Sequence, residues 1–125
     1  MSPESWLRAA PALQAALDHA GGTHTLDDVR AMIAAGEAQL WEGEAAWMVT
    51  AVENDPRDQR LMIWLAAGDL DELVSRLRPA AERWAKAAGC RRVLIAGRPG
   101  WERTLKSHGY APLARLIAKE LQDEL

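Results

Sequence analysis

The side chains that most often do chemistry are few and scattered in this chain. His19, His24 and His108 form no His-x-x-x-His helix pair and no ligand set, so the sequence predicts no metal site. Cys90 is the only cysteine, and neither a base nor a resolving thiol accompanies it. We therefore expect Cys90 to be inert and find no candidate catalytic nucleophile.

The join between a buried strand and a long helix is the place where an anionic ligand would bind. Backbone N–H groups at a helix start lack partners, and the helix dipole attracts anions there. The join reads Ala66-Ala67-Gly68-Asp69-Leu70-Asp71-Glu72. Asp69 is placed to cap the helix, with Glu72 three residues later as its capping-box partner. We therefore expect these carboxylates to occupy the amides that an anion would need.

A second loop, Gly97-Arg98-Pro99-Gly100, contains two glycines but no lysine of the phosphate-loop type, so it predicts a turn. Arg98 stands close to Trp101 in the sequence. These two residues are the remaining candidates for contact with an anionic ligand at the mouth of a cleft.

Apolar residues at helical spacing predict two helices near the N-terminus, over residues 4–20 and 25–36. Pro11 is expected to kink or divide the first of them. Thr25 begins the second helix, and Asp28 stands at the position of a reciprocal capping partner.

The apolar pattern then changes to a period of two, which predicts strands. Polar turns at Glu42-Gly43-Glu44 and over residues 53–58 are short, so the first three strands must form an antiparallel meander. A long helix separates the third strand from the fourth, which implies a parallel pair with a right-handed crossover. Strands are predicted over residues 39–41, 46–52, 61–66, 92–96 and 113–121.

Two further helices are predicted in the C-terminal half. The first is long and amphipathic, from Asp69 to Ala88, with a bend near Ser75-Arg76 because Pro79 interrupts it. The second is short, from Trp101 to His108, and Gly109 ends it.

This order of elements resembles the GNAT acyltransferase fold from about Leu7 to Leu121, with the usual first strand missing. The segment Trp101-Glu102-Arg103-Thr104-Leu105-Lys106-Ser107-His108-Gly109-Tyr110 is similar to that fold's short helix with a glycine–aromatic exit. The resemblance implies an α+β (or α/β) fold in one domain, residues 1–125. Its mixed central sheet, an antiparallel meander plus one parallel pair, would be flanked by about four helices.

The resemblance also implies where acyl-coenzyme A would bind. Proteins of this fold hold the pyrophosphate with backbone amides of a glycine-rich loop that opens the long helix. The matching loop here is degenerate, with one glycine among Ala66, Ala67, Gly68 and Asp69. With acidic side chains beside it, this loop predicts that no cofactor is bound.

The catalytic elements of the resembled fold are also altered. Many of its members carry a tyrosine general acid four residues before the glycine of the glycine–aromatic pair. Leu105 occupies that position here and cannot donate a proton. Trp101 replaces a small residue, and its bulk is expected to obstruct the cleft. Glu42, Glu44 and Glu53 lie at turn edges, where carboxylates are usually solvated, so we assign no catalytic residue.

The segment from Val93 to Tyr110 also looks like part of the small internal virion protein of some short-tailed phages. This resemblance implies a catalytically silent GNAT-like protein of phage or prophage origin, with a virion-structural or assembly role through contacts with other phage or host proteins. The alternative is an N-acetyltransferase that uses acetyl-CoA through an atypical cofactor loop. A fold that binds CoA without chemistry, or a host-directed inhibitor, stays open.

Size and charge exclude several classes of protein. The chain has 125 residues, 49% of them hydrophobic, which suits one domain with its own core. A net charge of −3 disfavours nonspecific binding of nucleic acid. No apolar run approaches the ~20 residues of a membrane helix, and no basic-then-apolar signal peptide is found. We expect a cytoplasmic or virion protein without nucleic-acid or membrane partners.

Overall fold

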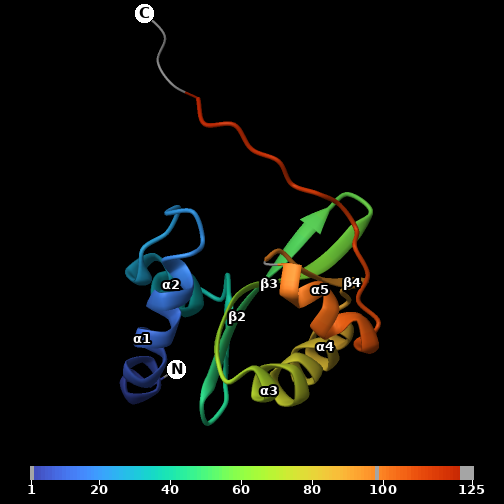
Figure 1. Cartoon of the computed structure of the whole chain (residues 1–125). Coiled ribbons are helices and arrows are strands. Elements are labelled where there is room, and N and C mark those ends of the chain that lie inside the picture. Colours follow the sequence, from blue (N-terminus) through green and yellow to red (C-terminus); the bar gives the residue numbers. More distant parts are fainter. Residues whose placement is uncertain (1, 98, 122–125) are drawn as a thin grey trace, which may run out of the picture.

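The computed structural model describes residues 2–97 and 99–121, and places a four-stranded sheet between two layers of helices (Figure 1). Helices α1 and α2 cover one face, and α3, α4 and α5 lie on the other. In chain order the elements are α1 (Pro3–Leu17), α2 (Leu26–Ala34), β1 (Gln39–Glu42), β2 (Ala46–Asp55), β3 (Asp58–Gly68), α3 (Leu70–Glu72), a π-helical segment (Leu73–Leu77), α4 (Arg78–Ala87), β4 (Arg92–Ile95), α5 (Pro99–Leu105) and a 3-10 turn (Lys106–His108).

The sheet has the order β1-β2-β3-β4. Strands β1, β2 and β3 pair antiparallel, and β4 joins β3 in parallel. This mixed topology confirms the predicted fold class, because α3 and α4 supply the crossover that a parallel pair needs.

Each face of the sheet contributes to a separate core. On the α1–α2 side, Val49 and Leu65 pack among the buried residues of the two helices, including Leu13. On the other side, Met48 and Ile63 pack against buried residues of the π-helical segment and α4. Burial on both faces explains why these strands are apolar along most of their length.

A β-bulge interrupts the pairing of β2 and β3. Thr50 pairs with Ile63 and Val49 pairs with Leu65, so Trp64 has no partner on β2. The extra residue reverses the alternation of side chains: Ile63 faces the α4 side, whereas Leu65 faces α1 and α2. A bulge also bends its strand and increases the local twist.

The N-terminal helices follow the prediction with one exception. Thr25 and Asp28 form the expected capping box, in which the Asp28 amide donates to Thr25 Oγ1 at 3.2 Å and the Thr25 amide donates to Asp28 Oδ2 at 2.8 Å. The expected division of the first helix at Pro11 is wrong, because α1 runs through it without a break. Pro11 lies on the exposed face, where water can take up the carbonyl that a proline leaves unpaired.

The long helix changes its winding at the predicted place. A five-residue π-helical segment, Leu73–Leu77, spans Ser75-Arg76, where the bend was expected. Pro79 follows in the first turn of α4. The wider turn provides a place for a residue that cannot donate to the helix ladder.

The C-terminal part differs from the prediction. The short helix begins at Pro99 instead of Trp101, and Gly109 ends it with a φ of 89°, as predicted. The predicted strand over residues 113–121 is wrong for the single chain. Residues 111–121 form neither helix nor strand and lead away from the body of the molecule (Figure 1). Among the described residues, no helix is long and apolar enough to cross a membrane.

Candidate functional site

The parallel strands β3 and β4 separate at their carboxyl ends. Their pairing runs from Arg60 and Arg92 to Ile63 and Ile95 and stops there. Beyond Ile63, β3 continues over residues 64–68 without a parallel neighbour, and Trp64, the bulge residue, stands at the start of this stretch. Ligands of sheets with parallel strands bind at such carboxyl ends.

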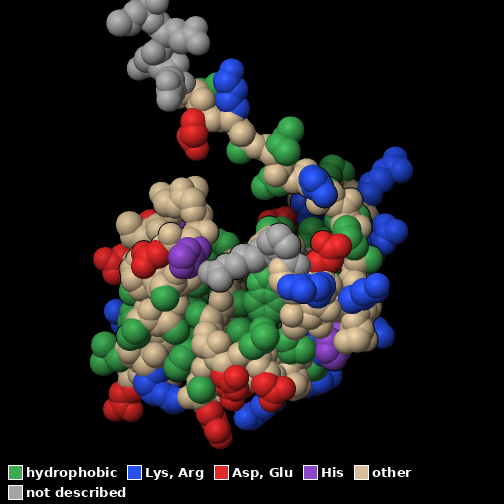
Figure 2. Space-filling model, viewed as in Figure 1, with side chains coloured by type: hydrophobic (Ala, Val, Ile, Leu, Met, Phe, Trp, Pro, Cys, Tyr) green, Lys and Arg blue, Asp and Glu red, His purple; other side chains and the backbone are tan. Residues whose placement is uncertain are grey.

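A cleft of about 900 Å³ lies where the two strands part. Figure 2 shows the molecule hollowed in this region, with hydrophobic side chains on the floor of the hollow. The cleft extends from α1 to α5 across the unpaired part of β3. Its lining includes Ala16 from α1 and His19 just after it, residues 63–68 from β3, residues 95–97 at the end of β4, Leu70 and Leu73 from the long helix, and Trp101, Arg103 and Thr104 from α5.

The cleft lining is mostly apolar, with two ionisable side chains among its described residues, His19 and Arg103. The other two histidines have different neighbours: the His24 ring packs edge-on against Trp64, with 4.7 Å between the ring centroids, and His108 lies beside Arg78. Within residues 2–97 and 99–121, no group of three potential ligands could hold a metal ion. Apolar side chains and exposed backbone polar groups both line the cleft, which therefore suits an elongated ligand with apolar and polar parts.

The carboxylates expected to cap the long helix do not do so, and this corrects the central electrostatic prediction. The side chain of Asp69 makes no capping hydrogen bond. The Asp69 amide donates to the Ala45 carbonyl oxygen at 2.8 Å instead of to Glu72. The side chains of Asp69 and Glu72 therefore do not bind the backbone amides at the start of the long helix, as they were expected to.

Glu72 instead fastens the helix start to the β1–β2 turn. Its side chain is buried, with the residue 7% exposed, and its carboxylate accepts the amides of Glu44 at 2.9 Å and Ala45 at 2.7 Å. Arg76 lies 3.5 Å from the same carboxylate. The amides of Ala45 and Glu44 hold the pKa of the Glu72 carboxyl below its usual value. The buried Glu72 carboxylate is therefore hydrogen-bonded to amides of a turn distant in sequence, and these bonds to a charged group are stronger than neutral ones.

Two glycines make this junction possible. At Gly43, a Cβ atom would collide with the carboxylate of Glu72. At Gly68, the φ of +100° is a conformation that favours glycine, and a Cβ would meet the carbonyl oxygen of Ala45 and lie 2.8 Å from Ala46 Cα. Gly68, the single glycine of the degenerate loop, is therefore required because the backbone of Ala45 and Ala46 passes against it.

The other predicted site residues lie on the opposite wall. Trp101 lines the cleft, and its indole lies so close to Gly97 that a Cβ there would be 2.9 Å from Trp101 Cδ1. Leu105 is 2% exposed and packs beneath the cleft, so this position offers no proton donor. Ala66 and Ala67 also line the cleft. Arg98 lies outside the described residues.

Sequence reasoning missed His19, Arg103 and Thr104. Two of them, Arg103 and Thr104, lie in the helix that carries the resemblance, one turn from Trp101. His19 follows α1, which gave no sign of reaching β3 before the fold was known.

Comparison by sequence finds no matching protein-family profile and no matching curated protein. Comparison of structures finds similar solved folds with acetyltransferase names. Glucosamine-6-phosphate N-acetyltransferase from Arabidopsis thaliana is 14% identical with a TM-score of 0.65, over 94% of this chain and 93% of that one. An acetyltransferase from Trypanosoma brucei is 12% identical with a TM-score of 0.64, over 96% of each chain.

A third similar structure, the aminoglycoside N-acetyltransferase AAC(6')-Iy in complex with CoA, is 13% identical with a TM-score of 0.57, over 76% of this chain and 89% of that one. Identities this low show the fold alone. The chain therefore has a GNAT-like fold, as its sequence predicts.

Proposed function

We propose that this chain binds an acyl-coenzyme A in the cleft between β3 and β4 and transfers the acyl group to an amine. The observation that carries the proposal is the parting of the two strands after the Trp64 bulge, which leaves an open cleft at the carboxyl ends of a parallel pair. The acetyltransferase names of the similar structures support the same chemistry by fold analogy.

The residues of the cleft fit the parts of such a ligand. The unpaired edge of β3 over residues 64–68 can exchange backbone hydrogen bonds with the amides of a pantetheine arm. The helix start at Leu70 lies at the same cleft, and the carboxylate of Glu72 is turned away toward the β1–β2 turn. The helix amides and dipole there favour a phosphate group. Exposed Asp69 and Asp71 oppose it, so we expect modest affinity.

The transfer step needs a proton acceptor, and His19 is the lining residue that can serve. The amine nitrogen attacks the thioester carbonyl carbon, the carbon–sulfur bond breaks, and the amine proton passes to the His19 imidazole. The leaving thiolate takes a proton from water. A thiol ionises at a pKa of about 8.5, so its departure does not depend strongly on a general acid. This is consistent with Leu105 in place of a tyrosine.

The charge of the cleft narrows the choice of acceptor. Arg103 contributes a positive charge, and no carboxylate is found among the described lining residues. An acceptor amine on an anionic molecule, such as an amino-sugar phosphate, suits this wall better than a polycation. Glucosamine-6-phosphate and a polycationic aminoglycoside are therefore the first two acceptors to compare.

Calorimetric titration with acetyl-CoA tests the binding step. We expect a Kd within about 1 μM to 1 mM, the range of ordinary substrate affinities. Ala96→Trp places an indole in the cleft and should weaken binding at least tenfold, or about 1.4 kcal/mol. Ala35→Trp, on an exposed position outside the cleft, is the matched control and should bind normally. Absence of binding by the unchanged protein refutes the proposal.

Release of the CoA thiol in the presence of each acceptor tests the transfer step. His19→Ala should lower kcat with little change in KM for acetyl-CoA. A second candidate function is a catalytically silent fold that acts through protein contacts, favoured by the buried Leu105 at the general-acid position. Binding without thiol release from any amine would support this candidate. A phage or virion setting stays a prediction, and detection of the protein in purified particles would test it.

A further inference from the structure

The C-terminal segment exposes apolar side chains that a folded protein normally buries. Leu116 is 95% exposed, Ile117 is 90% exposed, and Leu113 and Leu121 are also open to solvent. Figure 2 shows hydrophobic side chains along this segment where it leaves the body. In the single chain this segment forms neither helix nor strand and leads away from the body (Figure 1). An exposed segment with apolar side chains can pair with the free edge of a sheet.

The sheet has a free edge beside the point where this segment leaves. Strand β4 pairs with β3 on one side only. A groove of about 620 Å³ runs along β4, lined by Val93, Leu94 and Cys90, and by the first residues of the segment up to Leu113. The unpaired amides and carbonyls of β4 can accept another strand at this groove.

We propose that residues 113–121 of one copy add as a strand to the β4 edge of a second copy, which returns its own segment to the first. Each segment runs beside its own groove only as far as Leu113 and then leads away from β4 (Figure 1). Nine extended residues span about 30 Å, enough to reach a neighbouring sheet.

The composition of the segment fits this placement. In a strand, Leu113, Ile117 and Leu121 share one face with Arg115 and Lys119, and Leu116 falls on the other face. Apolar side chains on both faces suit a sheet that helices cover on both sides. Exchange of an identical element gives both copies the same contact, which closes a two-fold dimer and removes two free edges at once.

Sedimentation velocity on the full chain tests the assembly. The unchanged protein should sediment at about twice 13.7 kDa. Leu116→Asp with Ile117→Asp should give the single-chain mass and still unfold cooperatively, because neither side chain is buried within one copy. Leu7→Asp, at an exposed position on α1 outside the segment, is the control and should remain a dimer. A single-chain mass for the unchanged protein at its highest soluble concentration overturns the proposal.

The native Cys90 in the groove tests which copy supplies the strand. Mild oxidation of Ile117→Cys, or of Leu116→Cys for the other face, should give a covalent dimer that disappears when Cys90→Ser is added. A cross-link within one chain shows that the segment folds onto its own β4 and contradicts the exchange. A covalent dimer that persists with Cys90→Ser joins the two segments to each other and also contradicts it.

Discussion

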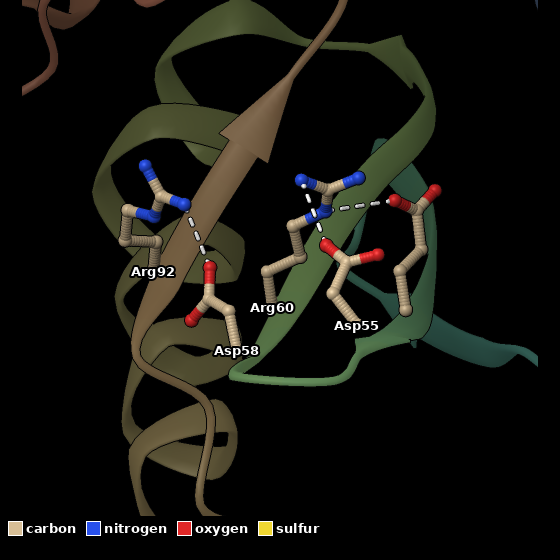
Figure 3. Close-up of polar contacts among 5 residues, drawn as sticks. Asp55, Asp58, Arg60 and Arg92 are labelled. Carbon is tan, nitrogen blue, oxygen red and sulfur yellow. Dashed lines mark hydrogen bonds and ion pairs between the residues drawn. The ribbon is translucent and has the colours of Figure 1, made fainter.

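The two ends of the β3–β4 pair differ in every property that decides whether strands stay together. At the closed end, Arg60 and Arg92 stand side by side in the parallel register. Carboxylates neutralise both: Arg60 lies 3.0 Å from Glu53 and 3.2 Å from Asp55, and Arg92 lies 2.7 Å from Asp58 (Figure 3). At the open end, the described residues provide no ladder and no ion pair, and an apolar cleft separates the strands.

This difference indicates that the backbone of β3, through its bulge, determines where the cleft opens. The closed end is held by the parallel ladder and by the ion pair between Arg92 and Asp58, and neither involves the open end. The open end starts where Trp64 adds a residue to β3. The bulge therefore marks the boundary between a structural half and a ligand-binding half of the same strand.

Deletion of Trp64 should have the largest effect on function. Without the extra residue, Ile63, Leu65 and Ala66 still alternate between the two cores, so the chain can fold with a regular ladder. The ladder should then extend and close the cleft, and acetyl-CoA affinity should fall more than 100-fold, about 2.7 kcal/mol. Trp64→Ala keeps the bulge and should bind within several-fold of the unchanged protein. Equal affinity of the deletion and the substitution would contradict this role of the bulge.

Gly68→Ala should have the largest effect on stability. The positive φ and the collision with the Ala45 carbonyl together should cost about 2–5 kcal/mol of unfolding free energy. Gly100→Ala meets no atom within 4 Å and serves as the control, with an expected change below about 1 kcal/mol. Urea denaturation measures both. Similar stability of the two variants would show that a Cβ atom at position 68 does not collide with the Ala45 carbonyl.

Glu72→Gln should change how stability depends on pH. The folded-state pKa of Glu72 is lowered, so its carboxylate stabilises the fold above the ordinary value of 4.5, and that contribution is lost as pH falls through the lowered pKa. The unchanged protein should exceed the variant in stability at pH 7, and the difference should shrink below pH 4.5. Denaturation midpoints across this range provide the test. If the difference in stability between the two proteins were the same at every pH, the pKa of Glu72 would not differ between the folded and unfolded states.

Arg60→Gln should have the smallest effect. Its ion pairs with Glu53 and Asp55 are partly exposed, and such pairs contribute about 0.2–1 kcal/mol. Acetyl-CoA affinity should not change, because this end of β3 is remote from the cleft lining. A loss of affinity would show that the two halves of β3 are coupled.

Local patterns predicted the parts of the fold that local interactions determine. The capping box of Thr25 and Asp28, the meander and the stop at Gly109 each depend on residues close in sequence. The spacing of Asp69 and Glu72 is equally good for a capping box, yet Glu72 binds amides from residues 44–45. A local sequence pattern cannot show that amide donors nearly thirty residues away compete for the Glu72 carboxylate.

The cleft could not be predicted from the sequence for a related reason. The run Ile63-Trp64-Leu65-Ala66 is apolar throughout, so it has no alternation in which an inserted residue could be seen. The C-terminal segment shows the opposite case: a strand was predicted over residues 113–121, but the described residues of the single chain pair no strand with it.

The most direct test of the account is a titration of the isotope-labelled protein with acetyl-CoA, followed by amide NMR. The amide resonances of residues 64–68 and 95–97 should shift, whereas those of residues 60–62 and 92–94 should not. No shifts at saturating ligand, or shifts centred on the ion-paired end, would contradict it.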